Sequence, residues 1–484
     1  MATTRSIESA EAPAGTPGAP LVPASPARVA WPLTWPAWEA VALVAVTGLA
    51  LFLRLHRVAD APLFTDNLDE IQFTWAGLNL ILHGDAYTWS LAPGYPDYIP
   101  FDAFGVTVPT VHHWLDHPPL FSLIMGGWVW LLGVRDMTDF SPEQVRVVPV
   151  AFSTATVPLT YLLGRRFLGS LAAICGVALL ATAPAAILLG RQAEPESLQA
   201  VLLLVGLLLC FRVVDGRAGI WTYVALVVCC FAAPLAKVSG IAVAGICGVI
   251  MVASGKWRLG AALGCAGLAG LALFVVYGAL IDWSLFLSAQ GVHAGFRIGV
   301  MSAYDFISAP AGINRRLRDG WWLLGWIGLG LIAARSDWRR QLFGVWPAAA
   351  YAATILVVAG ERQVEQYGWY RQIVYPEVYL AAGWVVAYAV RRSSVGLLTL
   401  TLVLGGATAT NWWLGGPAAT WVPNPVLPTL LMAVVVGPAA LLAYRRNRPL
   451  LRRWATGVAA AALGLILLGN AVESLWLDQI FVRL

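Results

Sequence analysis

Apolar runs long enough to cross a membrane alternate with short polar loops along most of the chain. A helix needs about 20 predominantly apolar residues to cross a bilayer. The first such run covers residues 38–55, and a long polar stretch, residues 59–144, follows it. We predict twelve further spans, near residues 145–163, 168–189, 197–214, 219–236, 238–253, 258–281, 320–334, 342–359, 373–390, 395–413, 426–443 and 455–473. The pattern predicts an all-α polytopic membrane protein with about 13 transmembrane helices.

Two helices are predicted inside the long polar stretch. In residues 64–84 (FTDNLDEIQFTWAGLNLILHG) apolar side chains recur at helical spacing, which predicts an amphipathic helix on the outer surface. Asp66 or Asn67 can cap it and Gly84 can end it. Residues 120–132 are apolar but too short to span, and Pro118-Pro119 precede them. This segment predicts a re-entrant or interfacial helix.

Composition supports the membrane assignment. Apolar residues make up 59% of the chain, charged residues only 12%, and the mean hydropathy is +0.72. So few charges cannot coat a soluble globule of 484 residues, which excludes soluble-enzyme and nucleic-acid-binding classes. Residues 1–37 are rich in Pro, Ala and Ser and predict a disordered tail, followed by one membrane domain over residues 38–484. All six cysteines fall in apolar runs, so we expect neither disulfides nor a cysteine metal site.

The distribution of Lys and Arg predicts the orientation. With the tail and every second loop on one side, that side has a net charge of +13 and the other −8, which together give the chain's +5. Lys and Arg are in excess on the cytoplasmic side of membrane proteins. The N-terminus is therefore predicted to be cytoplasmic, the C-terminus extracytoplasmic, and residues 59–144 the first extracytoplasmic loop. We expect the plasma (inner) membrane as the location.

Chemistry-bearing residues gather at the predicted outer face. Asp69 and Glu70 fall in the first turn of the predicted surface helix. Carboxylates favour that position for helix-dipole reasons alone. The functional alternative is a carboxylate held at the membrane boundary as a general base.

The segment HHWLDHPPL, residues 112–120, offers a second candidate group. Asp116 and His117 come just before the short interfacial helix, close to two further histidines. Such a group can bind a divalent metal, although its spacing matches no standard zinc pattern. Helix capping and hydrogen bonding are the alternative roles.

Further polar residues lie at predicted outer span junctions. Arg191, Glu194 and Glu196 lie together in GRQAEPESL, and Lys237 is a lone cation in PLAKVSG. Ionisable residues at membrane depth are functional candidates by default, whereas a lysine near a span end can also extend to the interface. Arg362, Arg371 and Tyr375 occur in residues 361–379. Arginines and tyrosines suit a phosphate and a sugar ring, and equally an interfacial belt.

The order of these motifs resembles the glycosyltransferase C superfamily, specifically the protein mannosyltransferase-like group that includes the lipid A aminoarabinose transferase. The resemblance is carried by the Asp-Glu pair on the first-loop helix, by Asp-His-Pro-Pro at residues 116–119, and by Arg165-Arg166. GRQAEPESL and LAKVSG follow at outer junctions. It extends well across residues 38–240 and more loosely beyond.

The resemblance implies specific roles. Asp69 matches the family's catalytic base, with Glu70 as its partner. Lys237 matches a basic residue facing the donor phosphate, and Glu196 stands where many members have Asp. The remaining predicted substrate-binding residues are Asp116, His117, Arg191, Arg362, Arg371 and Tyr375. No cofactor is assigned with certainty; a divalent metal stays an open candidate, with Asp69, His117 and Glu196 as candidate ligands.

The function expected from the resemblance is inverting glycosyl transfer. A sugar would move from a polyprenyl-phosphate donor to a lipid, glycan or envelope-polymer acceptor on the extracytoplasmic side, with the bilayer holding the donor. Protein O-mannosyl transfer is the alternative within this class. A transporter or flippase of lipid-linked sugars is the alternative from another class, but it predicts functional polar residues near mid-membrane and related halves, and we find no internal repeat.

Overall fold

The computed structural model describes residues 36–64, 67–90, 92, 94–297, 319–334, 341–359, 368–392, 394–409 and 449–478, with a few isolated positions besides. Helices dominate this part of the chain. Before residue 260 they are α1 (Ala37–Leu55), α2 (Asp69–His83), α3 (Pro119–Leu131), α4 (Pro142–Phe167), α5 (Ser170–Thr182), α6 (Pro184–Arg191), α7 (Pro195–Val214), α8 (Ile220–Ala236), η2 (Val238–Gly240) and α9 (Ile241–Ala253). They continue with α10 (Trp257–Arg297), α12 (Gly320–Ala333), η3 (Gln341–Val345), α14 (Trp346–Ala359), η5 (Trp369–Arg371), α15 (Tyr375–Arg392), α16 (Val395–Ala409) and α20 (Pro449–Ser474).

The helices confirm an all-α polytopic membrane architecture. Among the described residues four helices, α1, α4, α7 and α10, are long and apolar enough to cross a bilayer, and the bent pair α5–α6 can supply a fifth span. Seven further apolar helices of 10–17 residues accompany them. The count of 13 spans stays a prediction, and the predicted span at 426–443 lies largely outside the described residues.

Local sequence explains where the helices begin and bend. Ser141 and Gln144 form a reciprocal capping box at the start of α4, with Pro142 in its first turn. α5 and α6 meet at an angle of 60°. Pro184 begins α6 at a position where its missing N–H costs nothing, but it cannot continue the α5 hydrogen-bond ladder. The predicted span at 168–189 is therefore broken.

α10 is much longer than its predicted span at residues 258–281. A kink at Asp282, whose φ of −159° and ψ of 107° are not helical, divides it into two parts. The second part turns back over the first loop, and Gln290 on it donates a hydrogen bond of 2.8 Å to the Leu115 carbonyl. The long first loop is therefore covered by a helix from the middle of the chain.

The predicted first-loop helix forms, but it does not lie on the surface. α2 ends at Gly84 as expected, with a left-handed φ of 72°. Its residues from Glu70 to Asn79 are all buried, because α3 packs directly against it. Gly77 and Gly126 face each other at the crossing, where neither helix has a side chain to keep the backbones apart. The predicted short helix at 120–132 is confirmed as α3.

A small antiparallel sheet completes the loop and was not predicted from the sequence. β1 (Thr88–Trp89), β2 (Ile99–Ala103) and β3 (Val106–Val111) pair in the order β1-β3-β2. Phe104 and Gly105 connect β2 to β3 with φ values of 52° and 79°. Two positive φ values in a two-residue loop match the twist of a hairpin. A second apolar core, separate from that of the helical bundle, lies between the sheet, α2 and α3.

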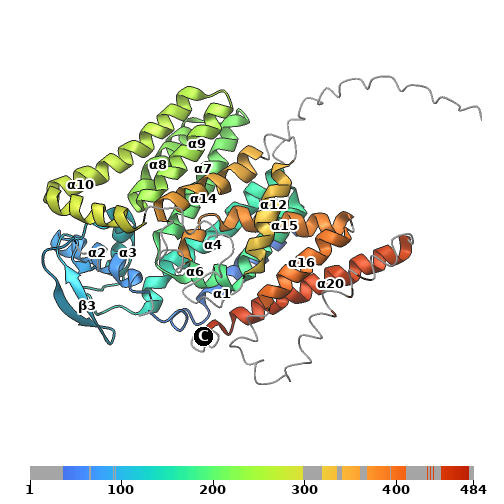
Figure 1. Ribbon diagram of the computed structural model, residues 1–484, viewed down its shortest axis with the longest axis horizontal. Helices are drawn as coiled ribbons and strands as arrows, with labels where there is room; N and C mark the ends of the chain where they lie inside the picture. The colour runs from blue at the N-terminus through green and yellow to red at the C-terminus, as the bar shows by residue number, and fades with distance from the viewer. Residues whose placement is uncertain are drawn as a thin grey trace, which may run out of the picture.

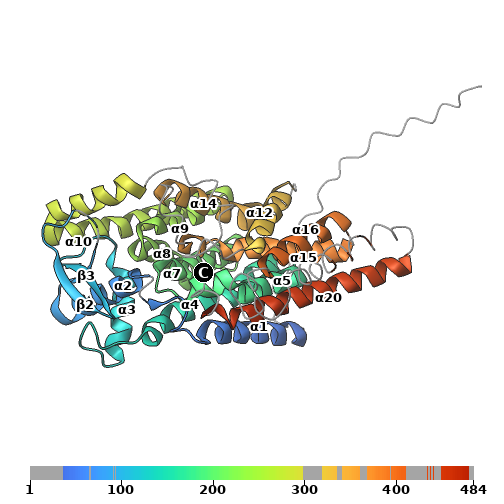
Figure 2. The same ribbon diagram turned by 60° about the horizontal axis from the view of Figure 1, so that its bottom comes forward.

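The loop elements gather at one end of the molecule. Figure 2 shows α1, α15 and α20 running along the long axis, with the strands, α2 and α3 together at one end. Figure 1 shows α10 beside α8 and α9 and extending over this end. The predicted first extracytoplasmic loop is thus a compact structure at one end of the helical bundle.

The contact between α2 and α3 gives the first prediction. A Cβ on Gly77 would overlap the Ser122 carbonyl, which belongs to rigid helix backbone. Gly77→Ala should therefore lower the unfolding stability by about 1–3 kcal/mol, a typical cost of overpacking. Gly127→Ala is the matched control, because its Cβ would meet only the end of the Ile81 side chain at 3.7 Å. Thermal unfolding of the purified protein in detergent measures both; equal stability of the two variants would contradict the close packing.

Candidate active site

Asp69 begins α2, where it is half-buried and held through its backbone. Its N–H donates a hydrogen bond of 3.2 Å to the Asn67 side-chain oxygen. The Asn67 amide in turn donates a bond of 2.8 Å to Glu194 Oε1. Asn67 thus connects the start of α2 to the link between α6 and α7. The residue at the cap position is Leu68 and not the predicted Asn67, and Asp66 lies outside the described residues.

Glu194, Glu196 and Lys237 form a buried charged cluster beside Asp69. Glu196 is fully buried in the first turn of α7, and Lys237, 7% exposed, follows the end of α8. The Lys237 ammonium donates to Glu196 Oε1 and lies 4.5 Å from the centre of the Tyr370 ring. Gln199 also holds the Lys237 carbonyl with a bond of 3.0 Å. The ammonium is therefore fixed by an anion, an aromatic face and its own backbone.

The pKa values in this cluster are shifted by burial and by the neighbouring charges. Burial raises the pKa of Glu194 well above its ordinary value, and the charges of Asp69 and Glu196 raise it further. Burial alone would lower the pKa of Lys237, but Glu196, Tyr370 and Glu194 hold it above its ordinary value. Lys237 is therefore a permanent cation, and the influence of Asp69 on Glu194 means that Asp69 belongs to the same group of charges.

Glu70 lies on the opposite side of α2 from solvent and forms a buried ion pair. Its two carboxylate oxygens accept bonds of 2.9 and 2.6 Å from Nε and Nη2 of Arg146. Both side chains are 0% exposed. Arg146 Nη1 also donates to the carbonyls of Val58 and Pro62, at 2.6 and 2.8 Å. Arg146 binds both oxygens of the Glu70 carboxylate. Glu70 therefore holds α2 in place and so positions its neighbour Asp69.

Asp116 is also buried and saturated with hydrogen bonds. Its carboxylate accepts from Ser90 and Tyr95 at 2.8 Å and from the Trp114 indole at 2.9 Å, and it lies 3.3 Å from His293 Nε2. Burial raises its pKa, but His293 and these donors hold the pKa below its ordinary value. Asp116 therefore joins the loop to the second part of α10.

His117 packs between α2 and the second part of α10. Its ring is 5.4 Å from that of Phe73 and 5.7 Å from that of His293. Phe73 is four residues after Asp69, so the two occupy the same face of α2 one turn apart. His117 thus lies beside the face of α2 that carries Asp69.

The other predicted residues lie apart from this cluster. Arg191 is buried and donates to the carbonyls of Leu53, His56 and Ala61, so it ties α6 to the end of α1. The Arg371 guanidinium lies 5.2 Å from the Trp322 ring centre. Arg362 lies outside the described residues.

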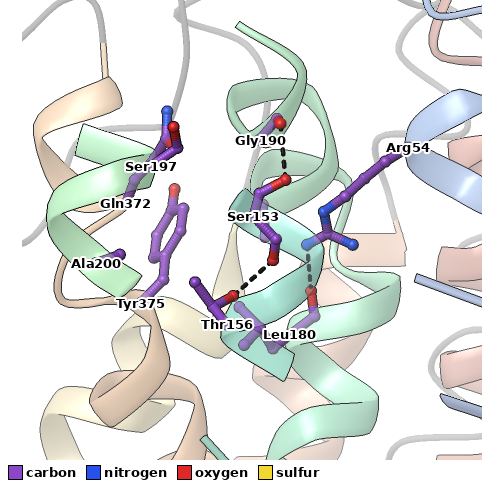
Figure 3. Close-up of a pocket in the computed structure, with 10 residues that line it drawn as sticks. Arg54, Ser153, Thr156, Leu180, Gly190, Ser197, Ala200, Gln372 and Tyr375 are labelled. Carbon is purple, nitrogen blue, oxygen red and sulfur yellow. Dashed lines mark hydrogen bonds between the residues drawn. The ribbon is translucent and has the colours of Figure 1, made fainter. Parts of the chain in front are cut away.

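Tyr375 lines a small cavity of about 20 Å³, enough for about one water molecule. Figure 3 shows Tyr375 on one side of this cavity and Arg54 on the other, with Ser153 between them. Arg54 is 1% exposed and donates to the Leu180 carbonyl at 3.2 Å. Ser197, in the first turn of α7, also lines the cavity, which therefore lies behind Glu196 within the bundle.

Lys237 and Glu196 are in direct contact, whereas Asp69 is connected to them only through the effect of its charge on Glu194. Neither this cavity nor a second one in the first loop is lined by these three residues or by His117. In the part of the chain that the structure describes, no group of three His, Cys, Asp or Glu side chains is arranged to hold a metal ion. The divalent metal and its candidate ligands Asp69, His117 and Glu196 stay a prediction.

Sequence reasoning missed three residues that organise the site: Arg146, His293 and Arg54. Arg146 and Arg54 are single charges inside apolar runs, and that pattern could have marked them. His293 carried no local signal, because its partner Asp116 is far away in the sequence.

Part of the chain matches a known protein family. The family model described as dolichyl-phosphate-mannose-protein mannosyltransferase matches residues 116–281, which include Asp116, Glu196 and Lys237. ArnT from Cupriavidus metallidurans, in a crystal structure bound to undecaprenyl phosphate, has a similar fold: TM-score 0.55, 17% identity, 92% of this chain and 78% of that one. Residues 116–281 are thus similar to this mannosyltransferase family, and the fold of the chain is similar to that of ArnT.

A second solved structure supports the same fold. The arabinosyltransferase EmbB from Mycobacterium smegmatis matches with a TM-score of 0.53 and 15% identity, over 92% of this chain and 41% of that one. No curated protein sequence matched. The expectation that the chain is a membrane glycosyltransferase is confirmed at this level by the family model and the folds.

The buried ion pair gives the second prediction for this glycosyltransferase. Glu70→Gln keeps the shape of the side chain but leaves the Arg146 charge buried without its anion. Removing one partner of such a pair costs about 3–5 kcal/mol. The variant should therefore unfold at a clearly lower temperature, whereas Glu143→Gln, at the start of α4, should unfold like the wild type. If Glu70→Gln unfolds at the same temperature as the wild type, this ion pair does not stabilise the first loop.

Proposed function

We propose that this glycosyltransferase moves a sugar, with inversion, from a polyprenyl-phosphate donor to a hydroxyl of an acceptor at the extracytoplasmic membrane surface. The observation that carries the proposal is the link between the start of α2 and the start of α7: Asn67, two residues before Asp69, donates to Glu194, whose pKa the Asp69 charge raises. Glu196, two residues after Glu194, accepts from Lys237. An acid that is half open to solvent thus stands beside a buried, permanent cation. This combination suits a base for an acceptor and a counter-charge for a phosphate.

Asp69 is the proposed general base. The acceptor oxygen attacks the anomeric carbon from the face opposite the phosphate and gives its proton to the Asp69 carboxylate. The new bond joins the acceptor oxygen to the anomeric carbon, and the bond from that carbon to the phosphate oxygen breaks. The electron pair of the broken bond stays on the lipid phosphate. Half-burial leaves the Asp69 carboxylate accessible, while the Asn67 contact fixes its helix turn.

Lys237 is the proposed partner of the leaving phosphate. A stabilised anion leaves more readily when a fixed cation meets its developing charge. Glu196 and Tyr370 hold the ammonium in place without solvent. Arg371, in the same short segment as Tyr370, and Arg362 are proposed second cations at the donor. Arg191 donates to three backbone carbonyls at the end of α1 and after it. We propose that it stabilises the start of the first loop.

The donor and acceptor classes follow from the lipid environment and from the relatives. Undecaprenyl phosphate is bound to ArnT, whose fold is similar, and we extend this class of lipid to the present chain. The plasma (inner) membrane, with the first loop outside, is the proposed location. A lipid, glycan or envelope polymer is the proposed acceptor. Protein O-mannosyl transfer is the second candidate, because the matching family model carries that description.

The base assignment is tested with Asp69→Asn. Asparagine keeps the shape but cannot take the acceptor proton, so turnover should fall by about 10²–10⁴-fold, the usual contribution of a general base. Purified protein with radiolabelled polyprenyl-phosphate sugars measures the transfer, and a filter assay measures donor binding, which should persist. Asp97→Asn, an exposed change in the same loop, is the control. Full transfer by Asp69→Asn would remove the catalytic assignment.

The phosphate assignment is tested with the two lysines of the chain. Lys237→Gln removes the buried cation and should lower turnover by about 10²–10³-fold, as loss of one charge-stabilising group does elsewhere. Lys256→Gln, at the other end of α9, should leave turnover unchanged. Inhibition by free polyprenyl phosphate should weaken only in the Lys237 variant. If free polyprenyl phosphate inhibits both variants equally, Lys237 does not bind the phosphate.

A further inference from the structure

A second cavity opens in the first loop, at the far end of α2 from Asp69. Its volume is about 300 Å³, which reaches the range of small-molecule binding sites, about 300–1,000 Å³. Asn79 and His83 line it from the last turns of α2, and Arg135 and Asp136 from the segment after α3. Chain segments distant in sequence thus enclose one hollow that the catalytic assignment does not use.

Aromatic and planar polar groups make up its wall. The centres of the Tyr87 and His112 rings lie 4.5 Å apart and the rings are inclined by 31°, so they stack on each other and form an aromatic part of the wall. Asp85 fixes His112 with a contact of 2.6 Å between the carboxylate and Nδ1. Tyr87 is also fixed, by a bond of 2.5 Å between its hydroxyl and that of Thr110. An aromatic surface beside planar hydrogen-bonding groups suits a ring that has C–H on its faces and hydroxyls at its rim.

The charges of the wall favour a neutral ligand. Asp85 and Asp136 are acidic, and Arg135 is the only arginine or lysine among the lining residues. A polyanion would meet these two carboxylates, so a lipid phosphate or a nucleotide does not suit the wall. Donors and acceptors are mixed, as a polyhydroxylated ligand requires.

The distance to Asp69 decides what the cavity could bind. Asn79 and His83 follow Asp69 by ten and fourteen residues on one straight helix, or about 15–21 Å at 1.5 Å per residue. A single sugar cannot extend over that length, but an oligosaccharide can. We propose that this cavity is a glycan-binding subsite that holds a distal, neutral sugar unit of the acceptor while its end unit reacts near Asp69.

The inference rests on the proposed function and narrows its acceptor to an oligosaccharide or polymer. The cavity contributes affinity rather than chemistry, since none of its groups lies near the reacting atoms. Its effect should therefore fall on the acceptor KM and leave kcat unchanged. For a short acceptor that cannot reach the cavity, changes in the cavity should not alter KM.

Two neighbouring histidines give a matched pair of variants. His112 and His113 both contact Asp85 and are similarly exposed, at 57% and 55%. Only His112 lines the cavity. His112→Asn should weaken binding about fivefold, the loss expected for one hydrogen bond or ring contact. His113→Asn should not change binding, and asparagine tolerates the positive φ of 53° there. His83→Ala provides a second change in the wall.

The experiment uses the full-length protein in detergent with short neutral mannose and arabinose oligosaccharides, and an oligogalacturonate as an anionic counterpart. Saturation-transfer NMR measures binding. Binding of a neutral oligosaccharide that weakens in His112→Asn and His83→Ala, but not in His113→Asn, supports the subsite. No binding, equal binding by all variants, or preference for the anionic oligosaccharide would overturn it.

Asp69→Asn distinguishes the failure of this inference from the failure of the proposed function, because this variant should bind the oligosaccharide like the wild type. If Asp69→Asn loses transfer but no oligosaccharide binds to the cavity in any protein, the proposed function stands and only the subsite is removed.

Discussion

The buried pair of Glu70 and Arg146 is the interaction on which the rest of the structure depends. One guanidinium binds the carboxylate of α2 and the carbonyls of Val58 and Pro62, which follow α1. The same carboxylate accepts the Ala193 N–H, which precedes α7, at 3.2 Å. Four segments of the chain, two of them far from the others in the sequence, therefore meet at a single charge pair. The adjacent residue, Asp69, owes its position to this junction, so the proposed general base is held in place by its neighbour.

Much of the fold could be predicted because its driving force is local. Apolar runs give helices wherever they occur, and α1, α4, α7, α8 and α12 begin and end within a few residues of their predicted limits. Gly84 ends α2 because only a residue without a Cβ adopts its left-handed φ easily. The loop helices were predicted as well, since α2 and α3 both have clear helical spacing or apolar continuity.

Burial and pairing could not be predicted from local patterns. The interior position of α2 depends on the facing glycines 77 and 126, which are 49 positions apart and carry no pairing signal in one sequence. β1 has two residues and depends on β3 for its hydrogen bonds. For the same reason the grouping of Asp69 with Glu196 and Lys237 was predicted only from the family resemblance. The pairing of Arg146 with Glu70 and of His293 with Asp116 could not be predicted before the fold was known.

The bare contact between α2 and α3 has a consequence for the surrounding lipid. α3 exposes Leu123, Trp130 and Leu131, and with this face in the outer leaflet it would settle at a depth set by bilayer thickness. At the glycine crossing no side chain separates the two helix backbones. We therefore expect α2 and α3 to move together as one rigid body. The height of Asp69 above the hydrocarbon then follows the lipid composition, and acyl-chain length becomes a control on how easily a membrane-borne phosphate and an aqueous hydroxyl meet.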